Sequence, residues 1–380
     1  MKQYFILISL KSLRSVINIL FFITVIFTYA SCNEDEDIII EDTIDRTVII
    51  YMAADNNLSD DALDNINQIK KSISNPKFNV IIFVDGVFET PSILKIEKNR
   101  SIIVKNYPEF NSADAKELNK VLLDIISMYP SKNYGLVLWS HGISWLPSGA
   151  SLRSFGNDNH RQMNISDLAS FLPIKFDYIL FDACLMGSVE VAYELKDKAD
   201  YIIASSTEIL SSGFPYPEVI NELSQLSPNM NKIAQNYFDY YNALQGAYRS
   251  ATISVIETQH LPELAYQFKI LLEENTVDLT TFNRTSVQRL DVYEEQYTFD
   301  LADFINKAFP DADKTAFLAQ LNKTVWYKNN TSQFIQLYDI NTYCGLSCYI
   351  PIFKRTDLNE YYKQLSWYKA GGYDKLFRKF

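Results

Sequence analysis

Short apolar runs that alternate with helical segments constrain the fold of this chain more than any other feature. Four of them lie in its first half, at residues 46–54, 78–85, 134–140 and 176–182. Their hydrophobic residues are consecutive, which is typical of strands buried on both faces of a parallel sheet. Segments with apolar residues three and four apart separate them, as at Leu63, Ile66 and Ile69. The pattern predicts an α/β fold with a parallel-rich sheet and helices on both faces.

The remaining elements complete this pattern and then depart from it. Further helices are expected at residues 118–128, 165–172, 185–195, 233–244 and 261–274. Further strands are expected as a hairpin at 92–96 and 101–105, and at 201–205, 252–256 and 345–351. After about residue 220 the chain becomes richer in helices. We therefore divide it into a core at 46–220 and a helical C-terminal region at 221–380, from which the strand at 345–351 returns to the sheet.

The N-terminus reads as a targeting segment. Three basic residues precede an apolar stretch at 16–30, and Ala30 and Ser31 come directly before Cys32. This order is typical of a secretory signal, and the stretch is somewhat short for a membrane-spanning helix. The Ala-Ser-Cys sequence resembles the lipobox of bacterial lipoproteins, in which the cysteine is acylated and becomes the first mature residue. The alternative is an ordinary cleaved signal, residues 1–31, with an incidental cysteine.

An acidic tether at residues 32–45 follows, beginning Cys-Asn-Glu-Asp-Glu-Asp. It resembles the tag that directs some lipoproteins to the outside of the outer membrane; the alternatives are a solvated spacer and a protein facing the periplasm. Removing residues 1–31 takes the formal charge from −11 to −14, because it deletes three positive charges and no negative ones. So acidic a chain is not expected to bind nucleic acid.

Two candidate catalytic residues follow the ends of two expected strands. His141 lies just after the strand at 134–140, and Cys184 lies just after the strand at 176–182. If both strands belong to one parallel sheet, the two side chains emerge at the same edge. A cysteine beside an imidazole and near a helix N-terminus can have a lowered pKa and act as a nucleophile.

Backbone groups near this pair are suited to stabilising a developing oxyanion. The N–H groups of Gly142 and Cys184 are the expected donors, and glycine lets the backbone approach a ligand closely. On spacing alone, a cysteine at a strand end is more often a small packed residue.

The other cysteines carry no comparable signal. Cys184, Cys344 and Cys348 follow the expected lipidation site, an odd number that leaves at least one free thiol in an exported protein. Cys344 and Cys348 would lie on the same side of one strand, too far apart for an unstrained disulfide. Two such residues are weak evidence for a metal, so we expect none there.

Several motifs in order resemble the clostripain family of cysteine peptidases, peptidase family C11, which has the caspase-like fold. They are YMAADNNL, WSHG, FDACLMGSVEVAYEL and GLSCYIP, and they span about residue 46 to residue 351. The resemblance implies that His141 is the general acid and base and that Cys184 is the nucleophile, with peptides or proteins as substrates and no cofactor required.

The resemblance also implies cleavage after Arg, or sometimes Lys, at a pocket lined by acids. Asp182 matches one of these acids; the alternative role is a cap for the helix at 185–195. The family's second acid is replaced by Pro215, and Glu208 is the candidate to compensate from the same loop. Basic specificity is therefore less secure than peptide hydrolysis.

Two further family properties are expectations here. Some members cleave themselves in the loop after the catalytic histidine, where Arg153 and Arg161 are the available basic sites; the alternative is a loop with two solvated arginines. Some members use calcium, although no calcium-loop motif is present. The competing class of function is a degenerate family member that acts as a surface protein-binding lipoprotein.

Overall fold

The computed structural model describes residues 44–74, 77–87, 90–147, 155–158 and 161–377. From residue 44 onward the chain forms one compact unit. The predicted signal segment, nearly all of the acidic tether, and Cys32 lie outside the described residues. In the described part, no helix is both long and apolar enough to cross a membrane.

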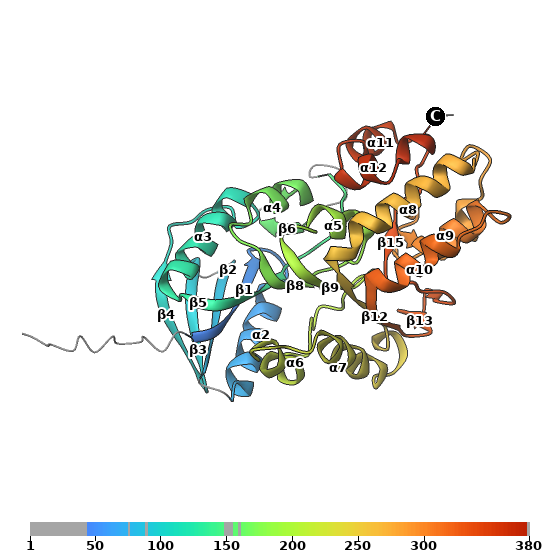
Figure 1. The fold of residues 1–380 in the computed structure, drawn as a ribbon. Coiled ribbons are helices and arrows are strands. Elements are labelled where there is room, and N and C mark those ends of the chain that lie inside the picture. Colours follow the sequence, from blue (N-terminus) through green and yellow to red (C-terminus); the bar gives the residue numbers. More distant parts are fainter. Residues whose placement is uncertain (1–43, 75–76, 88–89, 148–154, 159–160, 378–380) are drawn as a thin grey trace, which may run out of the picture. The chain divides into compact units, whose positions relative to one another are not determined.

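A nine-stranded sheet runs through this unit in the order β12-β10-β9-β8-β5-β1-β2-β3-β4 (Figure 1). Five central strands are parallel, namely β1 (Ile44–Ala54), β2 (Phe78–Gly86), β5 (Ser131–Trp139), β8 (Phe176–Asp182) and β9 (Ala199–Ala204). Antiparallel strands extend both edges: β3 (Ser92–Glu97) and β4 (Arg100–Asn106) on one side, β10 (Thr252–Glu257) and β12 (Val325–Asn330) on the other. The predicted α/β fold with a parallel-rich sheet is confirmed.

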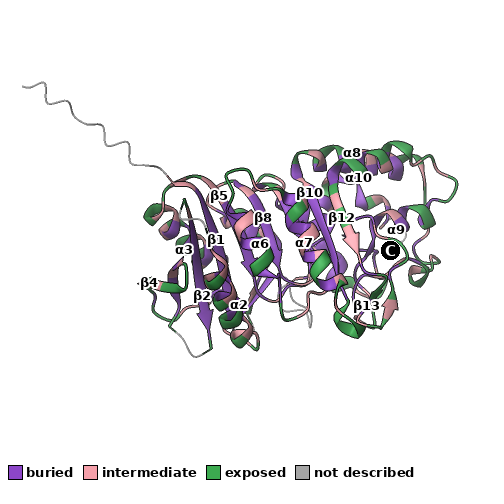
Figure 2. Cartoon of the chain, turned by 90° about the horizontal axis from the view of Figure 1, so that it is seen from below, coloured by how far each residue is buried: buried purple, intermediate pink, exposed green. Residues whose placement is uncertain are grey.

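Helices cover both faces of the sheet, as Figure 1 shows. One face carries α2 (Ser59–Ser72), α6 (Tyr216–Leu223) and α7 (Met230–Asn242); the other carries α3 (Ala115–Met128), α4 (Ile165–Phe171), α5 (Val189–Glu194) and α8 (Leu261–Glu274). Alternate residues of β1 enter the two cores, Ile49 and Tyr51 on the α3 face and Val48 and Ile50 on the α2 face. This double burial explains why apolar residues run consecutively in the central strands, which are buried in Figure 2.

The C-terminal part adds helices and two small two-stranded sheets to the unit, and a third small sheet lies in the segment between β5 and β8. The helices are α9 (Leu301–Ala308), α10 (Thr315–Thr324), α11 (Thr356–Tyr362) and α12 (Ser366–Ala370). The small sheets pair β6 (Phe155–Asp158) with β7 (Arg161–Met163), β11 (Phe299–Asp300) with β15 (Ser347–Cys348), and β13 (Gln333–Phe334) with β14 (Tyr338–Asp339). The predicted boundary at residue 220 falls inside α6.

The predicted return of residues 345–351 to the main sheet is wrong. Only Ser347 and Cys348 form a strand there, and it pairs with β11. The surrounding N–H groups are used elsewhere, since Ser347 donates to the Gly187 carbonyl at 2.9 Å and Tyr349 donates to Glu190 at 2.9 Å. The late strand that does return is β12, which pairs with β10.

A buried glutamate joins this C-terminal segment to α5. Glu190 has no exposed surface, and its Oε1 accepts hydrogen bonds from the Tyr349 N–H at 2.9 Å and the Tyr362 hydroxyl at 2.7 Å. Burial raises the pKa of Glu190 to about 7. The carboxyl therefore stays protonated in the folded protein over a pH range in which it ionises in the unfolded chain.

Glu190→Gln is expected to weaken the pH dependence of stability. The raised pKa means that this group stabilises the fold fully below about pH 4.5, and that the contribution is lost as the pH rises through about 7. The difference between the ordinary pKa of 4.5 and the raised value corresponds to about 3 kcal/mol in the free energy of unfolding. Urea unfolding at pH 5 and pH 8 measures it, with Glu274→Gln on the exposed end of α8 as the control. An unchanged pH dependence in Glu190→Gln would contradict this account.

Candidate active site

The register of two neighbouring strands brings His141 and Cys184 to one edge of the sheet. Trp139 on β5 pairs with Asp182 on β8 in parallel alignment. His141 and Cys184 each lie two residues beyond that pair, and the Ser140 N–H still donates to the Asp182 carbonyl at 3.3 Å. Both residues line one small cavity of about 200 Å³. The predicted meeting of the two strand ends is thus confirmed.

His141 is oriented by the turn that follows β1. Its Nε2 lies 2.9 Å from the Asn57 Oδ1, and its carbonyl accepts from the Gly156 N–H at 2.9 Å. The neighbouring Asn56 fixes this turn, because its side-chain amide donates to the Ala53 and Asn157 carbonyls. Asn57 was not predicted from the sequence as the partner of His141. The only signal was its place after the strand next to β5.

The thiol of Cys184 is held against the peptide of Ile209. The Ile209 N–H donates to Sγ at 3.3 Å, and Sγ lies 3.6 Å from the Ile209 carbonyl oxygen. Burial raises the pKa of the Cys184 thiol to about 12, and the negative charges of Glu208 and Asp182 act in the same direction. The expected lowering of this pKa is therefore wrong for the described state. The role of Ile209 was also missed, because nothing in the sequence of that loop indicates it.

The nearby helix does not supply the expected dipole. Helix α5 begins only at Val189, with the Ser188 hydroxyl accepting from the Val191 N–H at 3.2 Å. It is six residues long and starts five residues after Cys184. Since the helix dipole acts within the first turn, its effect on the sulfur is small. The helix is also shorter than the predicted 185–195. Leu185 has a left-handed backbone, with φ of 63°, so the helix cannot begin there.

Gly142 allows the two strand ends to approach closely. A Cβ at this position would lie 2.8 Å from the Cys184 carbonyl oxygen and 3.1 Å from the Ala183 Cβ. A larger residue would push the histidine segment away from the cysteine segment. The oxyanion role of the Gly142 and Cys184 N–H groups stays a prediction.

Asp182 lines the same cavity and is almost fully buried. Its Oδ2 accepts from the Phe214 N–H at 3.1 Å and the Tyr216 hydroxyl at 3.0 Å. Burial raises the pKa of this carboxyl to about 6. Asp182 does not cap α5. Its two remaining candidate roles are to anchor the loop at 213–216 and to contact the substrate.

Glu208 lies in the loop that covers Cys184. Its Oε1 accepts from the Val292 N–H at 3.1 Å, and burial raises its pKa to about 7. Pro215, at the expected position of a second acid, is the residue before α6. Asp182 is therefore the one acid that lines the described cavity beside Cys184.

The other candidate residues are not gathered at this cavity. Arg153 lies outside the described residues, and Arg161 is exposed at the start of β7. Cys344 and Cys348 are buried and unbridged, as expected. His260 pairs with Glu257 at 3.1 Å. Among the residues that the structure describes, no three His, Cys, Asp or Glu side chains form a group that could hold a metal ion.

Comparisons with known proteins agree with this geometry. The sequence profile of the clostripain family matches residues 50–370. Clostripain from Hathewaya histolytica is 26% identical over 223 residues, which are 47% of this chain and 42% of that protein, so the chain spans less than half the length of this relative.

Three solved structures are similar over most of the chain. An inactive zymogen of a C11 protease from Parabacteroides distasonis is 35% identical with a TM-score of 0.77, over 86% of this chain and 97% of that one. A secreted C11 cysteine protease from Bacteroides thetaiotaomicron is 29% identical with a TM-score of 0.78, over 86% and 99%. A complex of such a protease with an irreversible peptide inhibitor is 30% identical with a TM-score of 0.75, over 87% and 99%.

Proposed function

This chain belongs to the clostripain family of cysteine peptidases, and on that premise we propose that it is an exported, lipid-anchored endopeptidase that cleaves after Arg or Lys by a His141–Cys184 dyad. The observation that carries the proposal is the pairing of Trp139 with Asp182, which sends His141 and Cys184 into one cavity. The relatives described as secreted and as bound to a peptide inhibitor support export and a polypeptide substrate.

The dyad chemistry follows from these positions. His141 takes the proton of Cys184, and the thiolate attacks the scissile carbonyl carbon while the Gly142 and Cys184 N–H groups stabilise the oxyanion. His141 then gives the proton to the leaving amine as the C–N bond breaks. Water, deprotonated by His141, hydrolyses the thioester and restores the thiol.

We take the described state to be a resting one. Sγ lies against the N–H and the carbonyl of Ile209, and burial raises its pKa, so the neutral thiol is favoured at neutral pH. The alternative function, a surface protein-binding lipoprotein, draws on the same raised pKa and on Pro215.

A thiol-reactive peptide ending in Arg is expected to label the protein at Cys184. The label is read by mass spectrometry, beside a matched peptide ending in Gln. Cys344→Ala is the control for general thiol chemistry. Cys344 is buried, so its removal should leave the labelling unchanged. Equal labelling by both peptides contradicts basic specificity. No labelling, together with no turnover of a mixed peptide library, favours the binding protein.

Self-cleavage after Arg153 or Arg161 is a separate proposal. The exposed position of Arg161 at the start of β7 is compatible with it, and Arg153 lies outside the described residues. Purified wild type is expected to show two fragments on a denaturing gel, while Cys184→Ala stays intact. Equal banding of the two proteins excludes self-cleavage. Cys32 as the lipidated residue and placement at the outer membrane surface remain proposals from the N-terminal sequence.

A further inference from the structure

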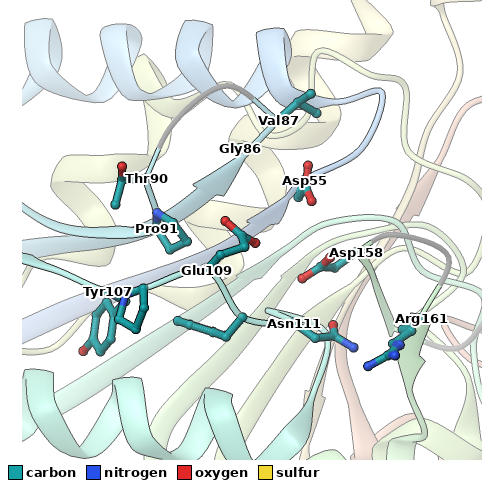
Figure 3. Close-up of a pocket in the computed structure, with 12 residues that line it drawn as sticks. Asp55, Gly86, Val87, Thr90, Pro91, Tyr107, Glu109, Asn111, Asp158 and Arg161 are labelled. Carbon is teal, nitrogen blue, oxygen red and sulfur yellow. The ribbon is translucent and has the colours of Figure 1, made fainter.

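A second and larger cavity opens on the other side of the turn that orients His141. Its volume is about 720 Å³, and its lining includes Asp55, Glu109, Asp158, Arg161, Tyr107 and Phe110. Figure 3 shows Asp55, Glu109 and Asp158 grouped on one side of the space, with Arg161 at the edge and Tyr107 opposite. Nothing in the dyad chemistry uses this cavity.

The carboxylates of this cavity are not neutralised by the protein. Asp55, Glu109 and Asp158 form no ion pair with Lys or Arg within the described part of the chain. Burial raises the pKa of both Glu109 and Asp158, and the charge of Asp55 adds to each shift. Arg161 acts against this on Asp158 alone. Three carboxyl groups thus share the lining with a single guanidinium, that of Arg161.

A buried carboxyl beneath the lining adds independent support. Asp85 is 1% exposed, and neither of its oxygens makes a hydrogen bond of normal geometry with the described residues. It lies on the face of β2 that carries Phe83, whose ring packs against those of Tyr107 and Phe110 in the lining.

Asp85 does not line the cavity itself, but it directly precedes Gly86, which does. Besides burial, the residues that raise its pKa, to about 7, are Glu109, Asp158 and Asp55, while the Ser112 hydroxyl lowers it. That hydroxyl is directed at Asp158, at 3.3 Å. An unpaired buried carboxyl is unfavourable unless it is neutral or a positive charge lies nearby. A cation in the cavity would offset the mutual repulsion of these carboxyl groups.

The cavity is connected to the catalytic dyad through two segments. Asp55 and Leu58 belong to one turn, and they line the acidic cavity and the cavity beside Cys184, respectively. Between them lies Asn57, the partner of His141. On the other side, β6 carries Asp158 in the acidic cavity and, two residues earlier, Gly156, which donates to the His141 carbonyl.

We propose that this acidic cavity binds an Arg or Lys side chain of the polypeptide substrate, at a position other than the residue held beside Cys184. A side chain fits the site better than a metal ion does. The cavity is far larger than one ion, and in the described residues no three acidic or imidazole groups converge to coordinate one. Tyr107 and Phe110 add apolar ring surface that an aliphatic stem can contact, while Lys105 and Lys120 already lie over these rings. That the bound side chain belongs to a substrate rests on the proposed peptidase function. That the cavity binds a basic side chain does not.

Binding to the full-length Cys184→Ala protein tests the proposal without turnover. Fluorescent peptides share one cleavable Arg, and a second Arg is placed at successive positions on either side of it; in the matched peptides this second residue is Gln. Fluorescence anisotropy is expected to show the best-placed second Arg binding about threefold to tenfold more tightly than Gln, with the difference decreasing at high salt.

Two variants locate the effect. Glu109→Gln, on the exposed side of the cavity, is expected to remove most of the difference, while Glu274→Gln on α8 keeps it. Equal binding of the Arg and Gln peptides at every position overturns the proposal, even if the enzyme hydrolyses both. An Arg preference in binding without any hydrolysis by the wild type overturns the peptidase function and leaves the cavity assignment standing. Calcium binding that Glu109→Gln abolishes, with no Arg preference, assigns the cavity to a metal and overturns the proposal.

Discussion

Cys184→Ala is expected to lower kcat/KM for peptide hydrolysis by about 10⁴-fold or more, because the bond-forming sulfur is removed. The methyl group of alanine fits where the thiol lies, so the contacts that Sγ makes with Ile209 are the main interactions lost. The fold should persist, and the midpoint of thermal unfolding should stay close to that of the wild type. Initial rates on an Arg-containing peptide measure the effect.

His141→Ala tests whether the two residues act as one unit. It is expected to lose most of the same activity, and the double variant should be little slower than Cys184→Ala alone, since each residue depends on the other. Cys348→Ala, at a buried and unbridged cysteine, is the control and should keep wild-type turnover. Additive losses in the double variant, or activity retained by Cys184→Ala, would show that these side chains are not a catalytic pair.

Strand patterns carried most of what the sequence could tell about this site. The expected strand at 176–182 coincides with β8, and the expected strand at 134–140 largely overlaps β5, because both are buried on two faces and are therefore apolar throughout. Parallel pairing then places their carboxyl ends together. The position of His141 beside Cys184 followed from that step alone.

Features that depend on loops and edges were not predictable in this way. Strand β12 (Val325–Asn330) has a largely exposed or half-buried pattern, so no continuous apolar run marks it. The segment around Ser347 has such a run, but its N–H groups donate hydrogen bonds to Gly187 and Glu190 rather than to the main sheet. The cover of Ile209 over Cys184 depends on tertiary contacts of its loop, which local sequence does not encode.

The pKa values illustrate the same limit. A strand end followed by a helix favours a thiolate only if the helix starts close by and the sulfur is open to solvent. Here α5 starts at Val189 and the Ile209 peptide lies against the sulfur. Burial then outweighs the remaining favourable effects on Cys184. The residue type was predictable, whereas its electrostatic state required the structure.

Asp182→Asn is expected to lower kcat/KM for peptides cleaved after Arg by about a hundredfold, with little effect on peptides cleaved after a neutral residue. Asparagine keeps the shape, and its amide oxygen can still accept from the Phe214 N–H and the Tyr216 hydroxyl. The loss should therefore come from the missing charge. An equal loss on both peptides, or a large drop in thermal stability, would assign Asp182 to anchoring the loop at 213–216 instead.

The pH profile separates these two roles further. Burial raises the pKa of the Asp182 carboxyl to about 6, so its charge is present above that pH and is lost as the pH falls through it. The ratio of kcat/KM for Arg peptides over neutral peptides should thus decline below about pH 6 in the wild type, and it should be flat in Asp182→Asn. Because His141 and Cys184 act on both peptides, their titration cancels in the ratio. A wild-type ratio that stays constant from pH 5 to pH 8 would mean that the Asp182 charge does not select the basic side chain.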